Sequence, residues 1–249
     1  MMKKVVVITG AATGLGRATA LKLATQGFNL VLVDFNEQQG LQTMKDAQAL
    51  GAEALFVKAD VSNEEEVKHY VAQAVETFGT IDFFFNNAGI MVPFRLLHDY
   101  TTEEYNRIMD INLKGPFLGI KHVIPVMLAN GGGTIINTVS SNSFKPTAYN
   151  GIYSATKHAL AAFTKSIGQD YQEQQIYAVG VAPNTMQTTI AQSATVTLDA
   201  TVGAAIHAST GKNIAATADE VAESMIFAME NGKLLTGSII NCAGGEIYN

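Results

Sequence analysis

The chain has 249 residues, of which 47% are hydrophobic, and this composition is ordinary for one α/β domain with a substantial core. A net charge of −6 excludes the basic surface that nucleic acid or an anionic membrane would attract. The single Cys242 excludes an internal disulfide and a cysteine-based metal cage, and the five histidines lack metal-ligand spacing, so we expect no bound metal.

The amino terminus resembles a signal peptide only briefly. Lys3-Lys4 is followed by an apolar run that stops after four residues, at Thr9-Gly10, which is too short for the core of a signal peptide. No segment approaches the roughly 18 uninterrupted apolar residues that a membrane helix needs. We therefore expect a cytoplasmic protein without a membrane partner.

Short apolar runs alternate with longer helix-period segments, a pattern typical of βαβ units on a parallel sheet. Several runs are apolar nearly throughout, as expected where helices cover both faces. The predicted strands are Val5–Thr9, Asn29–Asp34, Ala54–Lys58, Ile81–Asn86, Thr134–Val139, Ile176–Val181 and Ser238–Asn241. The pattern predicts a single domain over residues 1–249, an α/β fold with a doubly wound (Rossmann-type) parallel seven-stranded sheet.

Among the helical segments, one carries an apolar stripe at helical spacing that runs from Val67 to Phe78. A second, from about Thr101 to Leu128, is predicted to bend near Gly115-Pro116. The Thr- and Ala-rich region from Asn184 to about Ala216 breaks the alternating pattern. A connection of that length is typically a functional lid over the substrate, and the alternative is a surface insertion.

The first predicted strand runs directly into a glycine-rich turn, Thr9 to Gly16, and a helix follows. Glycines there let the backbone approach a pyrophosphate, because a Cβ would clash or block the required φ. The helix N-terminus adds free N–H groups and a positive dipole. The position of the turn between a strand and a helix therefore predicts a dinucleotide site.

The second predicted strand ends at Asp34. A carboxylate at this point accepts hydrogen bonds from both hydroxyls of an adenosine ribose and repels a 2′-phosphate. No Arg or Lys lies in residues 35–39 to neutralise such a phosphate, so NAD is favoured over NADP. The alternative for Asp34 is a helix N-cap, but Asn36 is better placed for that role.

Further motifs follow in order: Asp60-Val61, Asn86-Asn87-Ala88-Gly89, Asn112, Ser140, and Tyr153 with Lys157 four residues later. With the turn at 9–16, this series resembles the short-chain dehydrogenase/reductase family over nearly the whole chain. The resemblance implies a catalytic tetrad of Asn112, Ser140, Tyr153 and Lys157. It implies cofactor contacts at Gly10, Thr13, Gly14, Leu15, Gly16, Asp34, Phe35, Asp60, Val61, Asn86, Ala88, Gly89, Tyr153, Lys157, Pro183, Met186 and Thr188.

Two positions depart from the family pattern. Pro183-Asn184 replaces Pro-Gly after the sixth strand, and asparagine tolerates left-handed backbone better than other residues with a Cβ. Cys242-Ala243-Gly244-Gly245 replaces the more common Asp-Gly-Gly and changes local hydrogen bonding rather than the chemistry.

The tyrosine and lysine share a face of one predicted helix, being four residues apart. A tyrosine that acts as a base near pH 7 needs its pKa lowered by about 3 units, roughly 4 kcal/mol. A neighbouring ammonium and oxidised nicotinamide are cations that act in this direction. Ser140 would stabilise the substrate oxygen, with Ser141 and Ser143 as competitors. Asn112 would hold a proton-relay water, or else serve as a structural helix-kink residue.

These residues predict an NAD(H)-dependent oxidoreductase that interconverts a secondary alcohol and a ketone, with Tyr153 as the general acid and base. The alternatives are a β-ketoacyl-thioester reductase on the same scaffold and a catalytically silent dinucleotide sensor. The substrate surface is expected from Met91, Val92 and Phe94, from Ser143–Tyr149 and from the lid. Because little charge lies there, a modest, uncharged substrate is predicted, with Arg95, His98 and His207 as the alternative carboxylate binders. Family resemblance further implies a homotetramer, with a homodimer as second choice, packed through residues 101–128 and 153–172.

Overall fold

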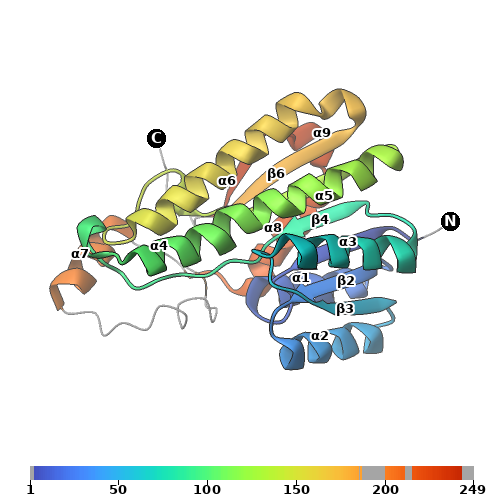
Figure 1. Ribbon diagram of the computed structural model, residues 1–249, viewed down its shortest axis with the longest axis horizontal. Helices are drawn as coiled ribbons and strands as arrows, with labels where there is room; N and C mark the ends of the chain where they lie inside the picture. Colours follow the sequence, from blue (N-terminus) through green and yellow to red (C-terminus); the bar gives the residue numbers. More distant parts are fainter. Residues whose placement is uncertain (1–2, 185, 187–199, 211–214, 243–249) are drawn as a thin grey trace.

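The computed structural model describes residues 3–184, 186, 200–210 and 215–242 (Figure 1). It contains a seven-stranded, wholly parallel sheet in the order β3-β2-β1-β4-β5-β6-β7. The strands are β1 (Val5–Thr9), β2 (Asn29–Asp34), β3 (Ala54–Lys58), β4 (Phe83–Asn86), β5 (Gly133–Thr138), β6 (Ile176–Pro183) and β7 (Ile239–Cys242). The predicted fold class is confirmed, and four of the seven strands differ from their predicted bounds by one or two residues at an end.

Helices cover both faces of this sheet, as the apolar strands predict. On β1, Val6 and Ile8 point into one core while Val5 and Val7 point into the other. The first core is covered by α1 (Gly14–Ala24), α2 (Glu37–Ala49) and α8 (Ala218–Glu230). The second is covered by α3 (Glu64–Phe78), α5 (Gly115–Ala129) and α6 (Gly151–Asp170). Two shorter helices, α7 (Ala200–Thr210) and α9 (Gly232–Leu235), complete the described part of the carboxyl-terminal region.

The segment predicted as one long helix is divided by a change of winding. Helix α4 (Thr102–Met109) begins with a capping box, in which the Thr101 hydroxyl and the Glu104 carboxylate accept each other's backbone N–H. A π-helical turn, Asp110–Lys114, then leads into α5. The irregularity therefore lies just before Gly115-Pro116, close to the predicted bend, and Pro116 has no N–H to donate to the turn that precedes it.

The strand order reverses between β1 and β4, because β2 and β3 lie on one side of β1 and β4 to β7 on the other. In open parallel sheets, ligands bind at the carboxyl ends of the strands beside such a switch point. Helices α4 and α7 lie together at one end of the molecule (Figure 1). Within the described ranges, no helix combines the length and the apolar character needed to cross a membrane.

Candidate active site

The glycine-rich turn after β1 has the backbone geometry that the sequence predicts. Gly10 and Gly14 have φ values of +67° and +52°, in the left-handed region that side chains with a Cβ disfavour. Gly16 has no room for a Cβ, which would lie 2.1 Å from the Gly10 carbonyl oxygen. Helix α1 therefore begins directly against the turn, and its N-terminus lies where a pyrophosphate would be bound.

Thr9 and Asn87 join the turn to the neighbouring strands. The Thr9 hydroxyl accepts the N–H groups of Asn87 and Ala88, both at 3.0 Å, and Asn87 Nδ2 donates to the Thr9 carbonyl at 3.0 Å. Asn87 Oδ1 accepts from the Thr138 hydroxyl at 3.1 Å. Asn87 thus links the ends of β1, β4 and β5, in line with the sheet-bracing role that the family resemblance implies for its motif.

Asn86, the first residue of the same motif, faces α5. Its side chain is buried and donates to the Pro116 carbonyl at 3.1 Å. The Asp60 carboxylate, after β3, accepts from the backbone N–H and hydroxyl of Ser62, at 2.9 and 2.7 Å. Val61 is buried and lies against Gly115, where a Cβ would come within 2.8 Å of Val61 Cγ2. Asn86 and Val61 thus pack against the start of α5, and the contacts of Asn86, Asp60 and Val61 with a cofactor stay predictions.

Asp34 lies at the end of β2 beside the turn. One carboxylate oxygen accepts the Ala12 N–H and the other accepts the Asn36 N–H, each at 2.9 Å. Asn36, and not Asp34, caps α2 by accepting the Gln39 N–H at 3.1 Å. Because each carboxylate oxygen has two lone-pair sites, the Asp34 carboxylate keeps acceptor capacity for ribose hydroxyls.

Beside Asp34 lies a depression of about 250 Å³, lined by Ala12, Thr13, Gly14, Arg17, Gln39 and Gln42. Arg17 is thus a cation close to the predicted adenosine site, although it belongs to α1 and not to residues 35–39, which contain no Lys or Arg. Its guanidinium is paired with Asp46 at 2.7 Å, and Asp46 also accepts from Gln42 at 2.8 Å. These two partners hold the pKa of the Asp46 carboxyl below its ordinary value. Phe35, at the rim, is 74% exposed.

Tyr153, Lys157 and Ser140 come together at the carboxyl end of β5. Tyr153 and Lys157 lie on α6 with 8% and 4% of their surface exposed, and the ammonium lies 5.7 Å from the centre of the tyrosine ring. Lys157 Nζ donates to the Thr138 carbonyl at 2.7 Å. The Ser140 side chain lies close enough to the Tyr153 phenol to act on its pKa, in the lowering direction. The structure therefore brings together three of the four residues predicted to be catalytic.

Burial shifts the two titratable groups of this cluster in opposite directions relative to their ordinary values. It raises the pKa of Tyr153 to about 12, which the hydrogen bond from Ser140 partly opposes. It lowers the pKa of Lys157 to about 8. Each shift disfavours the charged form, as expected for groups removed from water. For Tyr153 to be ionised near neutral pH, its pKa must therefore fall further than that of an exposed tyrosine, because burial has already raised it.

The three adjacent serines have different partners. The Ser143 hydroxyl donates to the Lys157 carbonyl at 2.9 Å, and the Ser141 hydroxyl donates to Asn184 Oδ1 at 3.1 Å. The Ser140 side chain instead acts on the Tyr153 phenol, whose pKa it tends to lower. These contacts favour Ser140 for the role at the substrate oxygen.

Asn112 lies in the π-helical turn and is 1% exposed. Its side chain makes two hydrogen bonds to Ile90, accepting the N–H and donating to the carbonyl, both at 2.8 Å. A Cβ on Gly89 would lie 3.4 Å from Asn112 Oδ1 and 3.8 Å from Lys157 Nζ, so Asn112 and Lys157 are near neighbours. Asn112 therefore braces the segment after β4 beside the lysine.

The loop after β6 is described only in part. Pro183 ends the strand, Asn184 accepts the Ser141 hydroxyl, and Met186 forms a parallel bridge with Ala216. The predicted contact at Thr188, most of the predicted lid and the Ala243–Gly245 departure lie outside the described residues.

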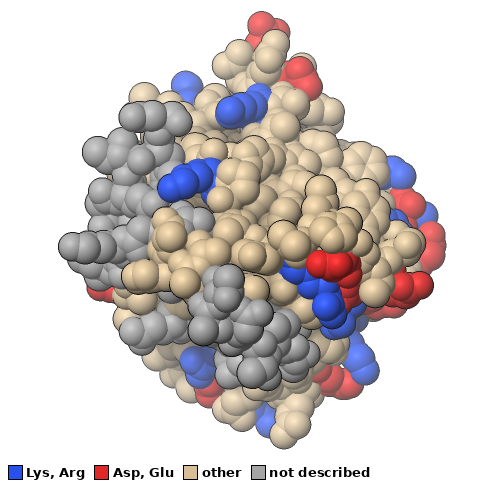
Figure 2. Space-filling model, turned by 90° about the vertical axis from the view of Figure 1, so that its left-hand side faces the viewer, with Lys and Arg blue, Asp and Glu red and all other residues tan. Residues whose placement is uncertain are grey.

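The surroundings of Tyr153 on the substrate side are apolar. Val92, Ile108 and Ile152 are buried against it, with Met91 and Tyr100 at the edge of the cluster. Arg95 is paired with Glu104 at 3.1 Å, and its backbone N–H donates to the Tyr149 carbonyl. Figure 2 shows this end of the molecule, where most described residues carry no charge.

Comparison with known proteins agrees with this geometry. A model of the short chain dehydrogenase family matches residues 4–199. Levodione reductase of Leifsonia aquatica is 38% identical over 199 residues, covering 79% of this chain and 74% of that protein. Cyclohexanol dehydrogenase of Acinetobacter sp. (strain SE19) is 35% identical over 185 residues, 74% of each protein.

Solved structures match over nearly the whole chain. The crystal structure of levodione reductase has a TM-score of 0.89 at 33% identity and covers 98% of both chains. That of 3-ketoacyl-(acyl-carrier-protein) reductase from Brucella melitensis, complexed with NADH, has a TM-score of 0.86 at 27% identity and also covers 98% of both.

Proposed function

Because the chain belongs to the short-chain dehydrogenase family of oxidoreductases, we propose that it interconverts a secondary alcohol and a ketone with NAD(H). The observation that carries this proposal is the buried cluster of Tyr153, Lys157 and Ser140 at the carboxyl end of β5. A buried tyrosine beside a buried lysine and a buried serine is typical of an acid–base site.

The glycine turn and Asp34 fit a dinucleotide, which would supply the hydride acceptor or donor when bound. In oxidation, Tyr153 accepts the alcohol proton, and Ser140 donates a hydrogen bond to the substrate oxygen. The Lys157 ammonium favours the ionised tyrosine and would hold ribose hydroxyls of the bound dinucleotide. In reduction, Tyr153 returns the proton to the carbonyl oxygen. Asn112 positions the backbone beside Lys157, where a relay water would connect the lysine to solvent.

The proposed preference for NAD over NADP rests on Asp34. Its carboxylate lies at the end of β2 and would repel a 2′-phosphate, while the nearby Arg17 is already paired with Asp46. The ketoacyl reductase from Brucella melitensis complexed with NADH shows that a related fold accommodates the unphosphorylated cofactor. That structure also means that NAD use alone does not separate alcohol oxidation from thioester-linked ketone reduction.

The proposed substrate is a modest, uncharged alcohol or ketone, because the wall around Tyr153 is apolar and Arg95 is neutralised by Glu104. The names of levodione reductase and cyclohexanol dehydrogenase are consistent with this class. Residues 184–216 are proposed to cover the substrate as a lid. A cytoplasmic location remains part of the proposal.

We further propose a homotetramer, with a homodimer as second choice. On α5, Phe117 and Leu128 are 48% and 44% exposed, and the Phe117 ring lies 6.4 Å from that of Phe163 on α6. A hollow on this face is lined by Phe117, Ile120, Lys121, Ile124, Pro125, Leu128 and Tyr171. Such an exposed apolar patch is typical of a subunit interface. Light scattering on a sizing column gives the mass, and a monomer would exclude the proposed assembly.

The decisive experiment follows NADH formation over a panel of secondary alcohols, starting with cyclohexanol, with NAD⁺ and NADP⁺ in parallel. The wild type is compared with Tyr153→Phe, which keeps the ring and removes only the proton-carrying oxygen. We expect turnover with NAD⁺ and its loss, by at least about a thousandfold, in the variant. Unchanged turnover in Tyr153→Phe would refute the mechanism. NADH binding without turnover of any alcohol or ketone would favour the silent sensor, and activity confined to acyl-thioester ketones would favour the thioester reductase.

A further inference from the structure

The serine at the active site is held against α6 by a turn that has its own side-chain contacts. This turn, the 3₁₀ segment Ser141–Ser143, directly follows Ser140. Two hydrogen bonds tie it to α6. The Ser143 hydroxyl donates to the Lys157 carbonyl at 2.9 Å, and the Ser154 hydroxyl donates to Asn142 Oδ1 at 2.8 Å. One contact is to Lys157 itself, and the other is to Ser154, the residue that follows Tyr153.

The bond between Asn142 and Ser154 lies in the protein interior. Asn142 is 9% exposed and Ser154 is 2% exposed. Asn142 Oδ1 accepts a second hydrogen bond, from the Thr147 N–H at 2.8 Å. The Ser154 hydroxyl also lies 2.9 Å from the Asn150 carbonyl, and its single hydrogen serves one acceptor at a time. The side chain of Asn142 is therefore fixed from two directions, and only one of these contacts depends on Ser154.

Fixing Asn142 also fixes the hydroxyl of Ser140. The Asn142 N–H donates to Ser140 Oγ at 3.2 Å. A serine hydroxyl has one hydrogen and two acceptor sites, so this N–H occupies one acceptor site and leaves the hydrogen available for donation. The phenol of Tyr153 is the neighbouring group on which the Ser140 side chain acts. The orientation of the serine thus depends on the backbone of the residue that Ser154 and Thr147 hold in place.

We propose that Asn142 and Ser154 are positioning residues that aim the Ser140 hydroxyl at Tyr153 and at the substrate oxygen. This inference rests on the proposed function, and it adds two residues that the motif series does not contain. Neither side chain touches the reacting atoms. Their effect on catalysis passes through Ser140 and disappears when Ser140 has no hydroxyl.

A double-mutant cycle on kcat tests that dependence, at saturating NAD⁺ and alcohol. In the wild-type background, Asn142→Ala is expected to lower kcat about tenfold, the effect of losing about 1.4 kcal/mol of transition-state stabilisation. Ser154→Ala is expected to lower it about threefold, because the Thr147 contact to Asn142 remains, and Ser154→Thr should restore most of the loss. In a Ser140→Ala background, Asn142→Ala is expected to change kcat by less than about twofold. Ser166→Ala, an exposed serine on the same helix, is the matched control.

A turnover-free measurement separates this proposal from the proposed function. In protein labelled at the tyrosine Cζ carbons, the Tyr153 resonance is identified by its absence in Tyr153→Phe. Ser140→Ala should move this resonance, Asn142→Ala should move it in the same direction, and the double variant should move it no further. If Asn142→Ala leaves it unmoved, or lowers kcat equally with and without the Ser140 hydroxyl, the positioning role is refuted. If the resonance responds as expected in a protein that oxidises no alcohol, only the proposed function fails.

Discussion

Replacement of Lys157 by methionine tests the electrostatic part of the mechanism. The ammonium lies 5.7 Å from the centre of the Tyr153 ring, and both side chains are buried. With this distance to the ring centre taken as the separation of the two charges, the ammonium and the phenolate interact by about 3 kcal/mol at an effective dielectric constant of about 20. That energy corresponds to a shift of about 2 units in the tyrosine pKa. Lys157→Met removes the charge while keeping an unbranched side chain of similar length.

The sign of the effect follows from which form of the tyrosine acts as the base. Alcohol oxidation needs the phenolate, so kcat rises with pH through the apparent pKa of Tyr153 in the complex. Removing a neighbouring cation destabilises the phenolate and moves the rising limb to higher pH by about 2 units. At pH 7, below the pKa of about 8 at which Lys157 loses its charge, the variant should be slower by about a hundredfold, and the difference should shrink at alkaline pH, where the wild type also loses this cation.

The assay is the pH profile of kcat at saturating NAD⁺, which removes any contribution from weaker cofactor binding. Lys165→Met, at an exposed position on the same helix, controls for the loss of a lysine. A Lys157→Met profile with the wild-type midpoint and only a lower plateau would show that the lysine does not tune the tyrosine, contrary to the reasoning given above.

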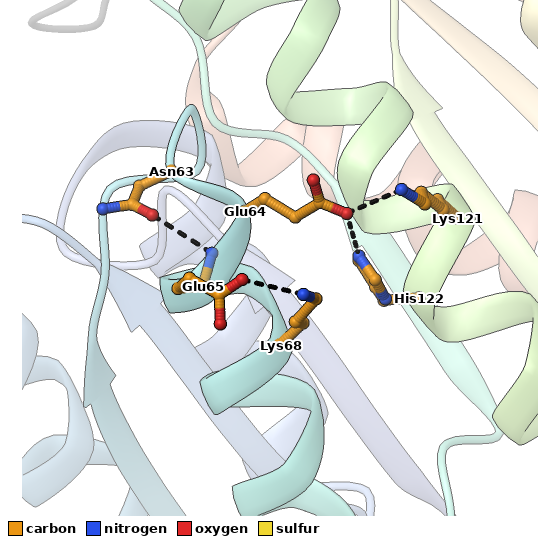
Figure 3. Close-up of polar contacts among 6 residues, drawn as sticks. All are labelled: Asn63, Glu64, Glu65, Lys68, Lys121 and His122. Carbon is orange, nitrogen blue, oxygen red and sulfur yellow. Dashed lines mark hydrogen bonds and ion pairs between the residues drawn. The ribbon is translucent and has the colours of Figure 1, made fainter.

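Three further changes have defined outcomes. Gly16→Ala places a Cβ 2.1 Å from the Gly10 carbonyl oxygen and should abolish NADH binding, measured by fluorescence, and unimpaired binding would contradict the turn geometry. Asp34→Ser should raise kcat/KM with NADP⁺ relative to NAD⁺ by at least about tenfold, and an unchanged ratio would remove the basis for cofactor preference. Hydrogen bonds from Lys121 and His122 on α5 lower the pKa of Glu64 from 4.5 to about 2 (Figure 3). The stability that Glu64 contributes is therefore present above pH 4.5 and lost as the pH falls toward 2. The unfolding midpoints of wild type and Glu64→Gln should converge over that range, and a constant difference would refute the ion-pair contribution.

The strands could be predicted because apolar runs that are buried on both faces are a local property of the sequence. Their ends depend on pairing, which is not local. Ile81 and Asp82 were predicted to begin β4, but the Asp82 carboxylate accepts the Val5 N–H at 2.8 Å and the Asp82 N–H donates to the Val5 carbonyl at 3.0 Å. Asp82 therefore caps the start of β1 and lies outside β4.

The same distinction applies to the candidate site. Tyr153 and Lys157 could be paired from their spacing on one helix. The choice of Ser140 among three serines depends on contacts with α6 and with Asn184 after β6, and the pairing of Arg17 with Asp46 joins α1 to α2. The raised pKa of Tyr153 could not be predicted either, because burial is a property of the assembled fold.

The π-helical turn lets one continuous helical segment pack beside Tyr153 at one end and on the sheet at the other. An α-helix advances by about 100° per residue, so a wider turn at 110–114 rotates everything before it relative to everything after it. Ile108, before the turn, packs beside Tyr153, whereas Leu118 and Met127, after it, pack on the sheet. Because of this rotation, side chains before the turn, beside Tyr153, can vary with the substrate. Side chains after the turn can keep their packing on the sheet.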